Sequence, residues 1–384
     1  MKWEIAKLGK IAIIRTGKLD SNAAVIGGRY PFFTCDPNTL SIDVWAYDTE
    51  AVLLAGNNAS GNYTAKYYKG KFNAYQRTYI IESANEEELN IRYLCYALNQ
   101  QLRLLKTMSS GSTTKFLTIR MLDNLDIPLL GINIQTQIVN ILSAYDDLIE
   151  NNQKQIKLLE EAAQRLYKEW FVDLRFPGHE NTKIVDGVPE GWRVASIADI
   201  CDTVGGGTPS TKIQSYYEKG DILWVTPTDI TRNFSLALLD TEKKITPEGL
   251  KNSSAKMLPA ETILMTSRAS VGFFGMCKYE VCTNQGFISC IPKRENLQMY
   301  LLFNLKSRVE EIRQKAGGST YLEISKTVFR ELKIILPKDE VLAEYQKNVH
   351  DIFDEIYCRT EMIKSLVDMR NRLLPKLMSG EVEV

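Results

Sequence analysis

An internal repeat is the feature that most constrains how this chain can fold. Residues 93–98 recur as residues 300–305, and residues 111–113 (Gly-Ser-Thr) recur as residues 318–320, both at a shift of 207 positions. A duplicated chain should fold with an internal pseudo-twofold axis. Two similar but unequal lobes suit a target with two similar but unequal parts, such as a DNA site made of two half-sites.

Each copy divides into a mixed segment and a long helical segment. The mixed segments contain short β-rich runs, such as residues 51–55 and 222–225, which are separated by turn signals such as the three glycines at 205–207. Each mixed segment also contains one predicted helix, near residues 88–106 and 295–315. The sequence therefore predicts an α+β fold, with one small α+β lobe in each copy.

Apolar residues repeat at intervals of three and four along the second part of each copy. In the second copy this heptad seam includes Tyr345, Val349 and Ile356, and the first copy has the same seam 207 positions earlier. Matching seams predict an antiparallel two-helix coiled coil that separates two pseudo-symmetric lobes. Each helix would be about 35 residues long, or roughly 50 Å. Asn152 and Arg359 interrupt the seams, and we expect them to fix the register; the alternative is a surface helix with a chance polar residue.

These patterns predict six segments. They are a first lobe at residues 1–132, a first spacer helix at 133–175, a linker at 176–187, a second lobe at 188–338, a second spacer helix at 339–379 and a tail at 380–384. The linker is polar and is broken by Pro177 and Gly178.

Composition indicates a soluble protein with reduced thiols. A hydrophobic content of 44% and a charged content of 24% are ordinary for a globular chain, and no apolar run is long enough to span a membrane. The seven cysteines form no Cys-x-x-Cys pair, so we expect reduced, mostly buried thiols and a cytoplasmic location. The formal net charge is zero, but the lobes are mildly basic and the other segments acidic, which fits contact of the lobes with DNA.

The sequence contains no set of residues that predicts catalysis, a metal or a cofactor. Its two histidines, His179 and His350, lie in the linker and in the second spacer helix, which favours neither a metal cluster nor a catalytic triad. No Gly-Lys-Ser/Thr phosphate loop and no Asp/Asn-Pro-Pro-aromatic motif occurs. Asp229 with Glu242 and Lys244 could imitate a nuclease site, but the first lobe has no counterpart. We therefore expect a non-enzymatic protein without metal or cofactor.

Polar turns at corresponding places in the two lobes are the candidate DNA-binding sites. Asn and Gln can pair with adenine and Arg with guanine, whereas Ser, Thr and Lys suit phosphate oxygens. For any single residue an ordinary turn or cap is the alternative. Recurrence with altered side chains, with Asn57 corresponding to Ser267 and Thr114 to Tyr321, favours binding. The candidates are Thr34, Asn57, Asn58, Asn62, Tyr63, Arg77, Thr114, Lys115, Thr208, Thr226, Thr228, Asp229, Ser267, Arg268, Asn284, Gln285, Thr320 and Tyr321.

The ordered set of motifs resembles a known family. The motifs are residues 189–192 (Pro-Glu-Gly-Trp), 206–210 (Gly-Gly-Thr-Pro-Ser) and 318–320 (Gly-Ser-Thr), with the helix ends at 166–173 and 373–381. Over its whole length the chain resembles the DNA specificity subunits of type I restriction-modification systems. The resemblance implies that each lobe is a target-recognition domain, that the helices hold the lobes apart, and that the subunit performs no catalysis.

The resemblance also implies the partners. They would be double-stranded DNA, two adenine methyltransferase (modification) subunits and restriction or translocase subunits, directed by this chain to a bipartite site with a fixed spacer. We expect apolar residues off the helical seam, such as Val172 and Phe353, to form the docking surface. The rival interpretations are a coiled-coil scaffold that binds proteins and a stand-alone nuclease.

Overall fold

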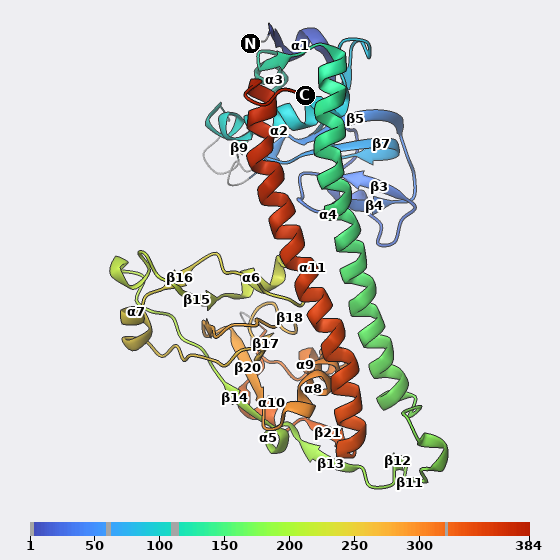
Figure 1. The fold of residues 1–384 in the computed structure, drawn as a ribbon, viewed down its shortest axis with the longest axis vertical. Coiled ribbons are helices and arrows are strands. Elements are labelled where there is room, and N and C mark those ends of the chain that lie inside the picture. The colour runs from blue at the N-terminus through green and yellow to red at the C-terminus, as the bar shows by residue number, and fades with distance from the viewer. Residues whose placement is uncertain (1–3, 59–62, 109–114, 319–321) are drawn as a thin grey trace. The chain divides into compact units, whose positions relative to one another are not determined.

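The computed structural model describes residues 4–58, 63–108, 115–318 and 322–384, and these fall into two compact units. Unit 1 comprises Met1–Asp147 and Leu366–Val384, and unit 2 comprises Leu148–Ser365. The division falls inside both long helices, α4 (Ile132–Tyr167) and α11 (Asp339–Ser379), so each unit contains a lobe and part of each helix (Figure 1).

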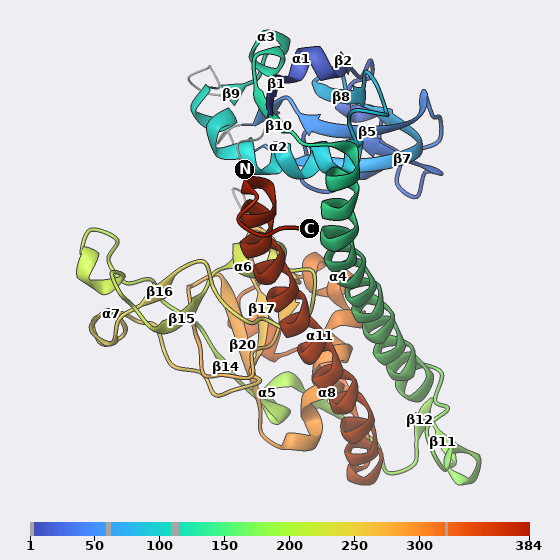
Figure 2. The same ribbon diagram turned by 45° about the horizontal axis from the view of Figure 1, so that its top comes forward.

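Unit 1 is built on a six-stranded sheet with a helix across one face. The strand order is β2 (Ala12–Thr16), β8 (Thr78–Ser83), β5 (Tyr47–Ala55), β7 (Ala65–Ala74), β3 (Tyr30–Phe33) and β4 (Leu40–Ile42). Helix α2 (Ile91–Met108) packs against β5 and β7 (Figure 2). Successive residues of a strand face opposite sides of a sheet. Accordingly Val52 and Leu54 belong to the core that contains α2, whereas Leu53 packs with Phe33 and Phe72 on the other side.

Unit 2 repeats this plan with shorter strands. Its larger sheet has the order β14 (Cys201–Val204), β20 (Phe287–Pro292), β17 (Ile263–Thr266) and β18 (Phe274–Gly275). A second sheet has the order β16 (Lys244–Ile245), β15 (Ile222–Val225) and β19 (Cys282–Thr283). The short helices of the lobe are α6 (Pro227–Thr231), α7 (Pro247–Lys251), α8 (Gln298–Ser307) and α9 (Val309–Gln314). Helix α8 is fully buried over residues 299–305, so it forms the core of this lobe.

The framework of the two lobes confirms the internal repeat. The pair β1 (Glu4–Lys7) and β10 (Asp126–Leu129) corresponds to β13 (Arg193–Ser196) and β21 (Lys333–Leu336), α1 (Leu8–Ile11) to α5 (Ile197–Ile200), and α3 (Ile119–Asp123) to α10 (Lys326–Arg330). The hydroxyl of Tyr93 donates to the carbonyl of Pro128 at 2.7 Å, and the hydroxyl of Tyr300, 207 positions later, donates to that of Ile335. A tyrosine therefore ties the core helix to the same closing strand in both lobes.

The long helices confirm the predicted antiparallel coiled coil. In unit 2, Tyr345 lies against Ala163, while Arg359 Nη1 donates to Asn152 Oδ1 at 3.2 Å, so residue numbers fall along one helix as they rise along the other. In unit 1, Arg370 Nη1 pairs with Asp146 Oδ1 at 2.6 Å. The apolar seam positions of α4 in unit 1 pack with Leu377 and Met378 of α11. The predicted domain boundaries stay a prediction.

One sequence expectation about the helices needs correction. Phe353 is not available as a docking residue, because it is 2% exposed and packs beside His350 and Tyr357; Val172 is 57% exposed. The segment predicted as a linker is partly regular. It contains a 3-10 turn, His179–Asn181, and the hairpin of β11 (Ile184–Val185) and β12 (Val188–Pro189).

The thiols and the hydropathy of the helices agree with the sequence. Cys201, Cys277, Cys282 and Cys290 are buried and free, and burial raises the pKa of Cys282 to about 12. A thiol with so high a pKa is not ionised near neutral pH and is chemically quiet. Within the described ranges, every helix is too short or too polar to cross a lipid bilayer.

Candidate nucleic-acid interface

The polar edge of unit 2 is the place where three loop segments meet at the ends of β14, β17 and β20. We define it as residues 205–209, 267–270 and 284–286. The amide of Gly207 donates to the carbonyl of Thr283 at 2.9 Å, and the amide of Ser267 donates to that of Gly286 at 2.8 Å. A Cβ on Gly206 would lie 2.1 Å from the Thr283 carbonyl oxygen, so the loop approaches this closely only because it has no side chain there.

The polar edge of unit 1 is built in a similar way, with the same bond between its second and third segments and the same close approach of a loop glycine. We define it as residues 17–20, 56–57 and 75–77. The amide of Gly17 donates to Thr78 O at 3.1 Å, and the amide of Gly56 donates to Arg77 O at 2.8 Å. A Cβ on Gly17 would lie 2.1 Å from the carbonyl oxygen of Ala74. The two lobes thus present their loops on the same backbone frame.

This frame corrects one sequence correspondence. The Gly56 carbonyl accepts from Leu117 N at 2.8 Å, and the Ser267 carbonyl accepts from Ile324 N at 3.0 Å, so Ser267 corresponds to Gly56. Asn57 had been matched with Ser267, but it corresponds to Arg268. Asn57 pairs with Phe116, and Arg268 forms the equivalent bridge to Glu323 in the other lobe. The sequence match was therefore wrong by one position. The other match, Thr114 with Tyr321, lies outside the described residues.

A glutamine occupies the equivalent turn of each polar edge. Gln285 is exposed, and its Oε1 accepts a hydrogen bond from the hydroxyl of Thr208 at 2.5 Å. Gln76 is exposed too, and its Nε2 donates to Asp20 Oδ1 at 2.7 Å. Gln285 and Thr208 were both candidates from sequence, and the structure brings them together. Asp20 was missed, and from the polar turn of Gln76 and Arg77 only Arg77 was kept as a candidate, although Gln76 precedes a strand just as Gln285 does.

Two arginines lie at the polar edges in non-equivalent places. Arg77 is exposed, and within the described ranges its guanidinium has no hydrogen-bond or ion-pair partner. Arg268 is about half exposed, and its Nε lies 3.6 Å from Glu323 Oε2. Lobe one therefore presents its arginine from the turn before β8, and lobe two from the segment after β17. Both are available for phosphate or guanine.

Several candidates already have an intramolecular role. Thr226 and Asp229 form a capping box at the start of α6: Asp229 Oδ2 accepts from Thr226 N at 2.8 Å and from the Thr226 hydroxyl at 2.6 Å. Asn284 Oδ1 accepts from Gly286 N at 2.8 Å, and Thr34 Oγ1 accepts from Asp36 N at 3.2 Å. These groups satisfy backbone donors that would otherwise be unpaired. Their contact with DNA stays a prediction.

The remaining candidates differ in how far the structure describes them. Ser267 and Tyr63 are buried, whereas Thr228 is exposed beside the α6 cap. Asn57 pairs through its backbone in the ladder of β6 (Asn57–Asn58) and β9 (Lys115–Phe116). The residues outside the described ranges are Asn62, Thr114, Thr320 and Tyr321, together with the side chains of Asn58 and Lys115.

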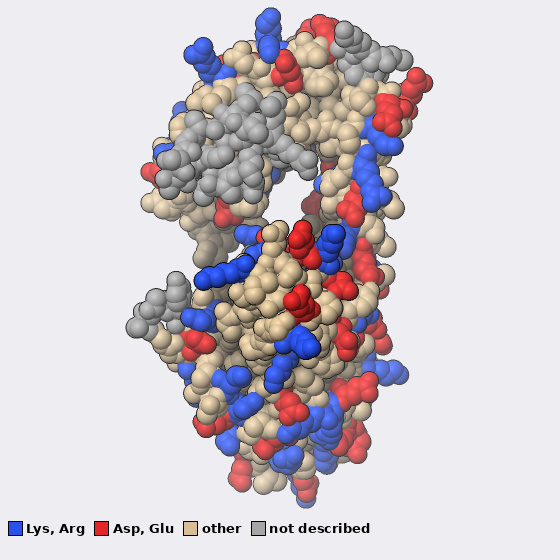
Figure 3. All heavy atoms as spheres, turned by 90° about the vertical axis from the view of Figure 1, so that its left-hand side faces the viewer, with Lys and Arg blue, Asp and Glu red and all other residues tan. Residues whose placement is uncertain are grey.

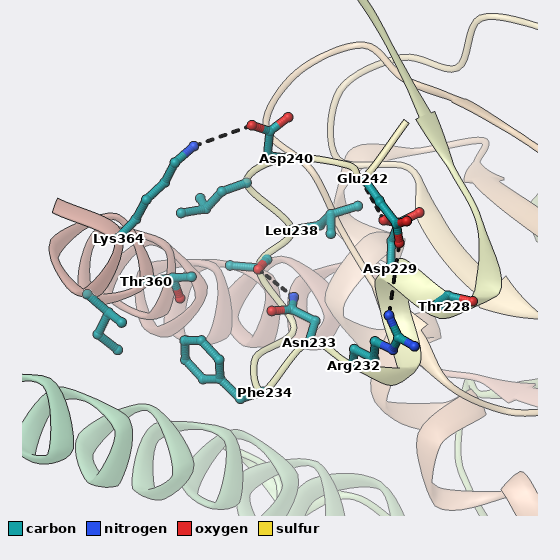
Figure 4. Close-up of a pocket in the computed structure, with 13 residues that line it drawn as sticks. Thr228, Asp229, Arg232, Asn233, Phe234, Leu238, Asp240, Glu242, Thr360 and Lys364 are labelled. Atoms are coloured by element: carbon teal, nitrogen blue, oxygen red, sulfur yellow. Dashed lines mark hydrogen bonds and ion pairs between the residues drawn. The ribbon is translucent and has the colours of Figure 1, made fainter. Parts of the chain in front are cut away.

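A cleft of about 320 Å³ in unit 2 lies between the loop after α6 and helix α11 (Figure 4). Four of its charged groups form two ion pairs: Lys364 Nζ lies 3.5 Å from Asp240 Oδ2, and Arg232 Nη1 lies 4.0 Å from Glu242 Oε2. The loop is also attached to the helix by the hydroxyls of Ser235 and Thr360, 3.1 Å apart. The cleft is therefore a junction between the lobe and the helix, and none of its lining residues belongs to the three segments of the polar edge.

His350 is less isolated than the sequence suggested. Its Nε2 lies 3.0 Å from Glu261 Oε2, and its Nδ1 lies 3.4 Å from Asp354 Oδ2. The Asp354 carboxylate is also paired with Lys278 at 2.5 Å. Within the described residues these three groups could hold a metal ion by proximity. The two ring nitrogens face different carboxylates, however, so the arrangement is better described as an ion-pair network that joins the lobe to α11.

The surface of unit 2 has mixed charge. Lys and Arg side chains intermix with Asp and Glu over the face shown in Figure 3, as the formal net charge of zero would suggest. A broad positive field attracts DNA regardless of sequence. With intermixed charges, affinity on this face has to come from individual contacts.

Comparison with known proteins decides the family. A family model described as the type I restriction modification DNA specificity domain matches residues 1–161 and again residues 189–367. The chain belongs to this family. The double match also confirms that each repeat is one copy of the specificity domain.

Specificity subunits of named type I enzymes are similar to part or most of this chain. The specificity subunit of the MjaIX type I restriction enzyme of Methanocaldococcus jannaschii is 38% identical over 173 residues, covering 44% of this chain and 39% of that relative. The specificity subunit of the EcoDI enzyme of Escherichia coli is 26% identical over 382 residues, covering 91% and 81%. The crystal structure of a type I restriction-modification S subunit from M. genitalium has a TM-score of 0.61 at 18% identity, covering 98% and 96%, and confirms the fold.

Membership in the specificity family gives the role of the chain. The chain is a DNA specificity subunit and a non-catalytic recognition component, as expected from its sequence. The comparisons do not test which side chains touch DNA.

The capping box of α6 leads to a test that separates structural from DNA-contact roles. We expect Thr226→Ala to lower the free energy of unfolding of unit 2 by about 1 kcal/mol, since the cap oxygen is lost. Thr228→Ala, two residues along and exposed, is the matched control and should change it by less than about 0.5 kcal/mol. Urea unfolding of the purified chain measures both. Unchanged stability in Thr226→Ala would contradict the capping role.

Proposed function

We propose that this specificity subunit reads a bipartite DNA site, with one half-site for each polar edge, and brings modification and restriction subunits to that site. The observation that supports the proposal is the duplicated backbone frame with different side chains. Gly17 and Gly206 hold the same close approach, while Asn57 in one lobe corresponds to Arg268 in the other. A shared scaffold with altered tips provides two specificities on one fold.

The chemistry of the polar edges supports reading by a few direct contacts. Tethered amides at Gln76 and Gln285 suit base edges, whereas Arg77 and Arg268 suit either phosphate or guanine. The mixed surface charge of unit 2 agrees with this division, because broad positive fields favour binding to any sequence. A scaffold that binds only proteins would leave these polar groups without a role. A stand-alone nuclease would need catalytic groups at these edges, which instead present amides and arginines.

The coiled coil supports a spacer of fixed length. Asn152 and Arg359 are repeat counterparts, and they contact each other at 3.2 Å. We infer that the buried Asn152 amide fixes the register of the helices at this point, since a slipped register would remove the Arg359 donor from its oxygen. We infer that helix length sets the distance between the two half-sites.

Partner binding is inferred from the helices. Exposed apolar side chains lie on the helices in both repeats. Leu158 in α4 is 62% exposed, Val172 in the π-helical turn Lys168–Val172 that follows α4 is 57% exposed, and Met362 in α11 is 47% exposed. Exposed apolar surface of this kind favours protein docking. Because the chain is duplicated, it offers two similar surfaces, and we propose that two adenine-methylating modification subunits bind one copy of it.

Lobe exchange tests independent reading. Replacing residues 188–338 with the corresponding lobe of a relative should change one half-site and preserve the other, because each polar edge is built within its own lobe. Mapping methylated adenines in DNA from cells that contain the subunit with its partners measures this. The reciprocal exchange of residues 4–130 is the control and should change the opposite half-site. If either exchange altered both half-sites, independent reading would be wrong.

Helix extension tests the spacer. Seven residues inserted beside Asn152 in α4 and seven beside Arg359 in α11 keep the heptad in phase and lengthen the pair by roughly 10 Å. The accepted spacer should grow by about three base pairs at ~3.4 Å each, with both half-sites unchanged. The same insertion in the segment 176–187, outside the helices, is the control and should leave the spacer alone. A changed half-site with an unchanged spacer would rule out this role.

The mass of the assembled modification complex tests the stoichiometry. We expect two modification subunits for each copy of this chain, because the repeat duplicates the docking surface. Native mass measurement at increasing partner concentration would give the ratio. Saturation at one partner for each chain would contradict the proposal. Leu158→Asp should weaken assembly, whereas the exposed polar Gln153→Asp should not.

A further inference from the structure

Gln76 and Gln285 stand at the same point of the two repeats. Each follows the backbone carbonyls that the loop glycine approaches, those of Ala74 and Tyr75 for Gly17 and those of Thr283 and Asn284 for Gly206. Each also precedes the strand that forms the centre of its polar edge, β8 or β20. The two lobes carry different residues at most of the other polar-edge positions. A glutamine in both lobes at this point therefore distinguishes the position from its neighbours.

Both glutamines are held by a side chain of the neighbouring loop, although by opposite ends of the amide. In unit 1, Gln76 Nε2 donates to Asp20 Oδ1 at 2.7 Å, and the backbone amide of Gln76 donates to Leu19 O at 2.8 Å. In unit 2, Gln285 Oε1 accepts from Thr208 Oγ1 at 2.5 Å. Asp20 and Thr208 belong to the loops that follow Gly17 and Gly206, so the same pair of loops makes the tether in both lobes.

Among the residues that the structure describes, the tethers leave the reading groups of each amide available. The amide of Gln76 uses one N–H on Asp20 and keeps its second N–H and its oxygen. The amide of Gln285 uses one oxygen lone pair on the Thr208 hydroxyl and keeps both N–H groups and the other lone pair. Each exposed side chain therefore presents a donor beside an acceptor. Adenine displays the complementary pair in the major groove, with N7 accepting and N6 donating.

We propose that Gln76 and Gln285 are equivalent base-reading residues, each specifying one adenine in the half-site of its own lobe, and that Asp20 and Thr208 position them. This proposal rests on the proposed function. A glutamine side chain loses rotational freedom when it binds, and a tether that holds it beforehand reduces this loss. The tether therefore explains how exposed, flexible residues can discriminate between bases.

The test uses the assembled complex of the full chain with its modification subunits, and its readout is the methylated sequence in cellular DNA. Gln76→Ala should relax one adenine position in the half-site of lobe one, by roughly 5- to 150-fold in discrimination. Gln285→Ala should do the same in the other half-site, and neither should affect the partner half-site. Gln314→Ala, on the exposed surface of α9, is the matched control and should leave both half-sites unchanged.

Two further kinds of substitution separate base reading from a structural role. One gives the glutamine side chain a charge, and the other removes the side chain that tethers it. Gln285→Glu keeps the Thr208 contact but offers acceptors alone, so the preferred base should change from adenine toward cytosine, whose N4 donates. Gln76→Glu would place two carboxylates together at Asp20 and should lose discrimination without a new preference. Thr208→Val and Asp20→Ala should give a smaller relaxation at the same base positions as the corresponding glutamine variants.

The possible outcomes distinguish this proposal from the proposed function. Relaxation confined to one base position for each glutamine supports it. A uniform fall in methylation with unchanged half-sites, or no change in either variant, overturns the base-reading role and leaves the bipartite function standing. If the unaltered complex methylated no bipartite sequence, the proposed function would fail, and this inference with it.

Discussion

The contact between Asn152 and Arg359 is the constraint on which the helical framework of unit 2 depends. Asn152 is 4% exposed within an otherwise apolar seam, where its Nδ2 donates to Leu148 O at 2.8 Å and its Oδ1 accepts from Arg359. Arg359 is held in turn by Glu355 at 2.5 Å. An apolar seam tolerates sliding by a heptad, whereas a buried amide left without its partner costs free energy. We therefore propose that this polar pair defines which turns of α4 and α11 face each other.

Much of the architecture could be predicted because duplication and periodicity are visible in the residues themselves. The shift of 207 positions relates Tyr93 to Tyr300, and the structure gives both the same bond to a closing strand. The heptad seam likewise predicted the antiparallel helices. The burial of Phe353 was not predictable, since its position off the main seam does not say which side chains pack around it.

The candidate site was harder to predict because the same residue types cap helices and bind DNA. Thr226 and Asp229 looked like a binding turn, and the structure uses them to start α6. Gln76 lay beside Arg77 in the sequence, and its importance depends on Asp20, 56 positions earlier in the chain. Asn57 was matched one position away from its counterpart, and the bonds of Gly56 with Leu117 and of Ser267 with Ile324 show the true correspondence. Hydrogen-bond partners distant in sequence decide such questions.

The pairing of Asn152 with Arg359 has a consequence for how the chain distinguishes itself from a second copy. These residues occupy one and the same repeat position, so each helix meets its own duplicate there. If two first helices came together, two amides would meet and could bond to each other, because an amide both donates and accepts. Two second helices would bring together two guanidinium groups, which repel and accept nothing. Because the two repeats differ at this single position, α4 can pair with α11 without repulsion between like charges. The same difference disfavours the pairing of two copies of α11.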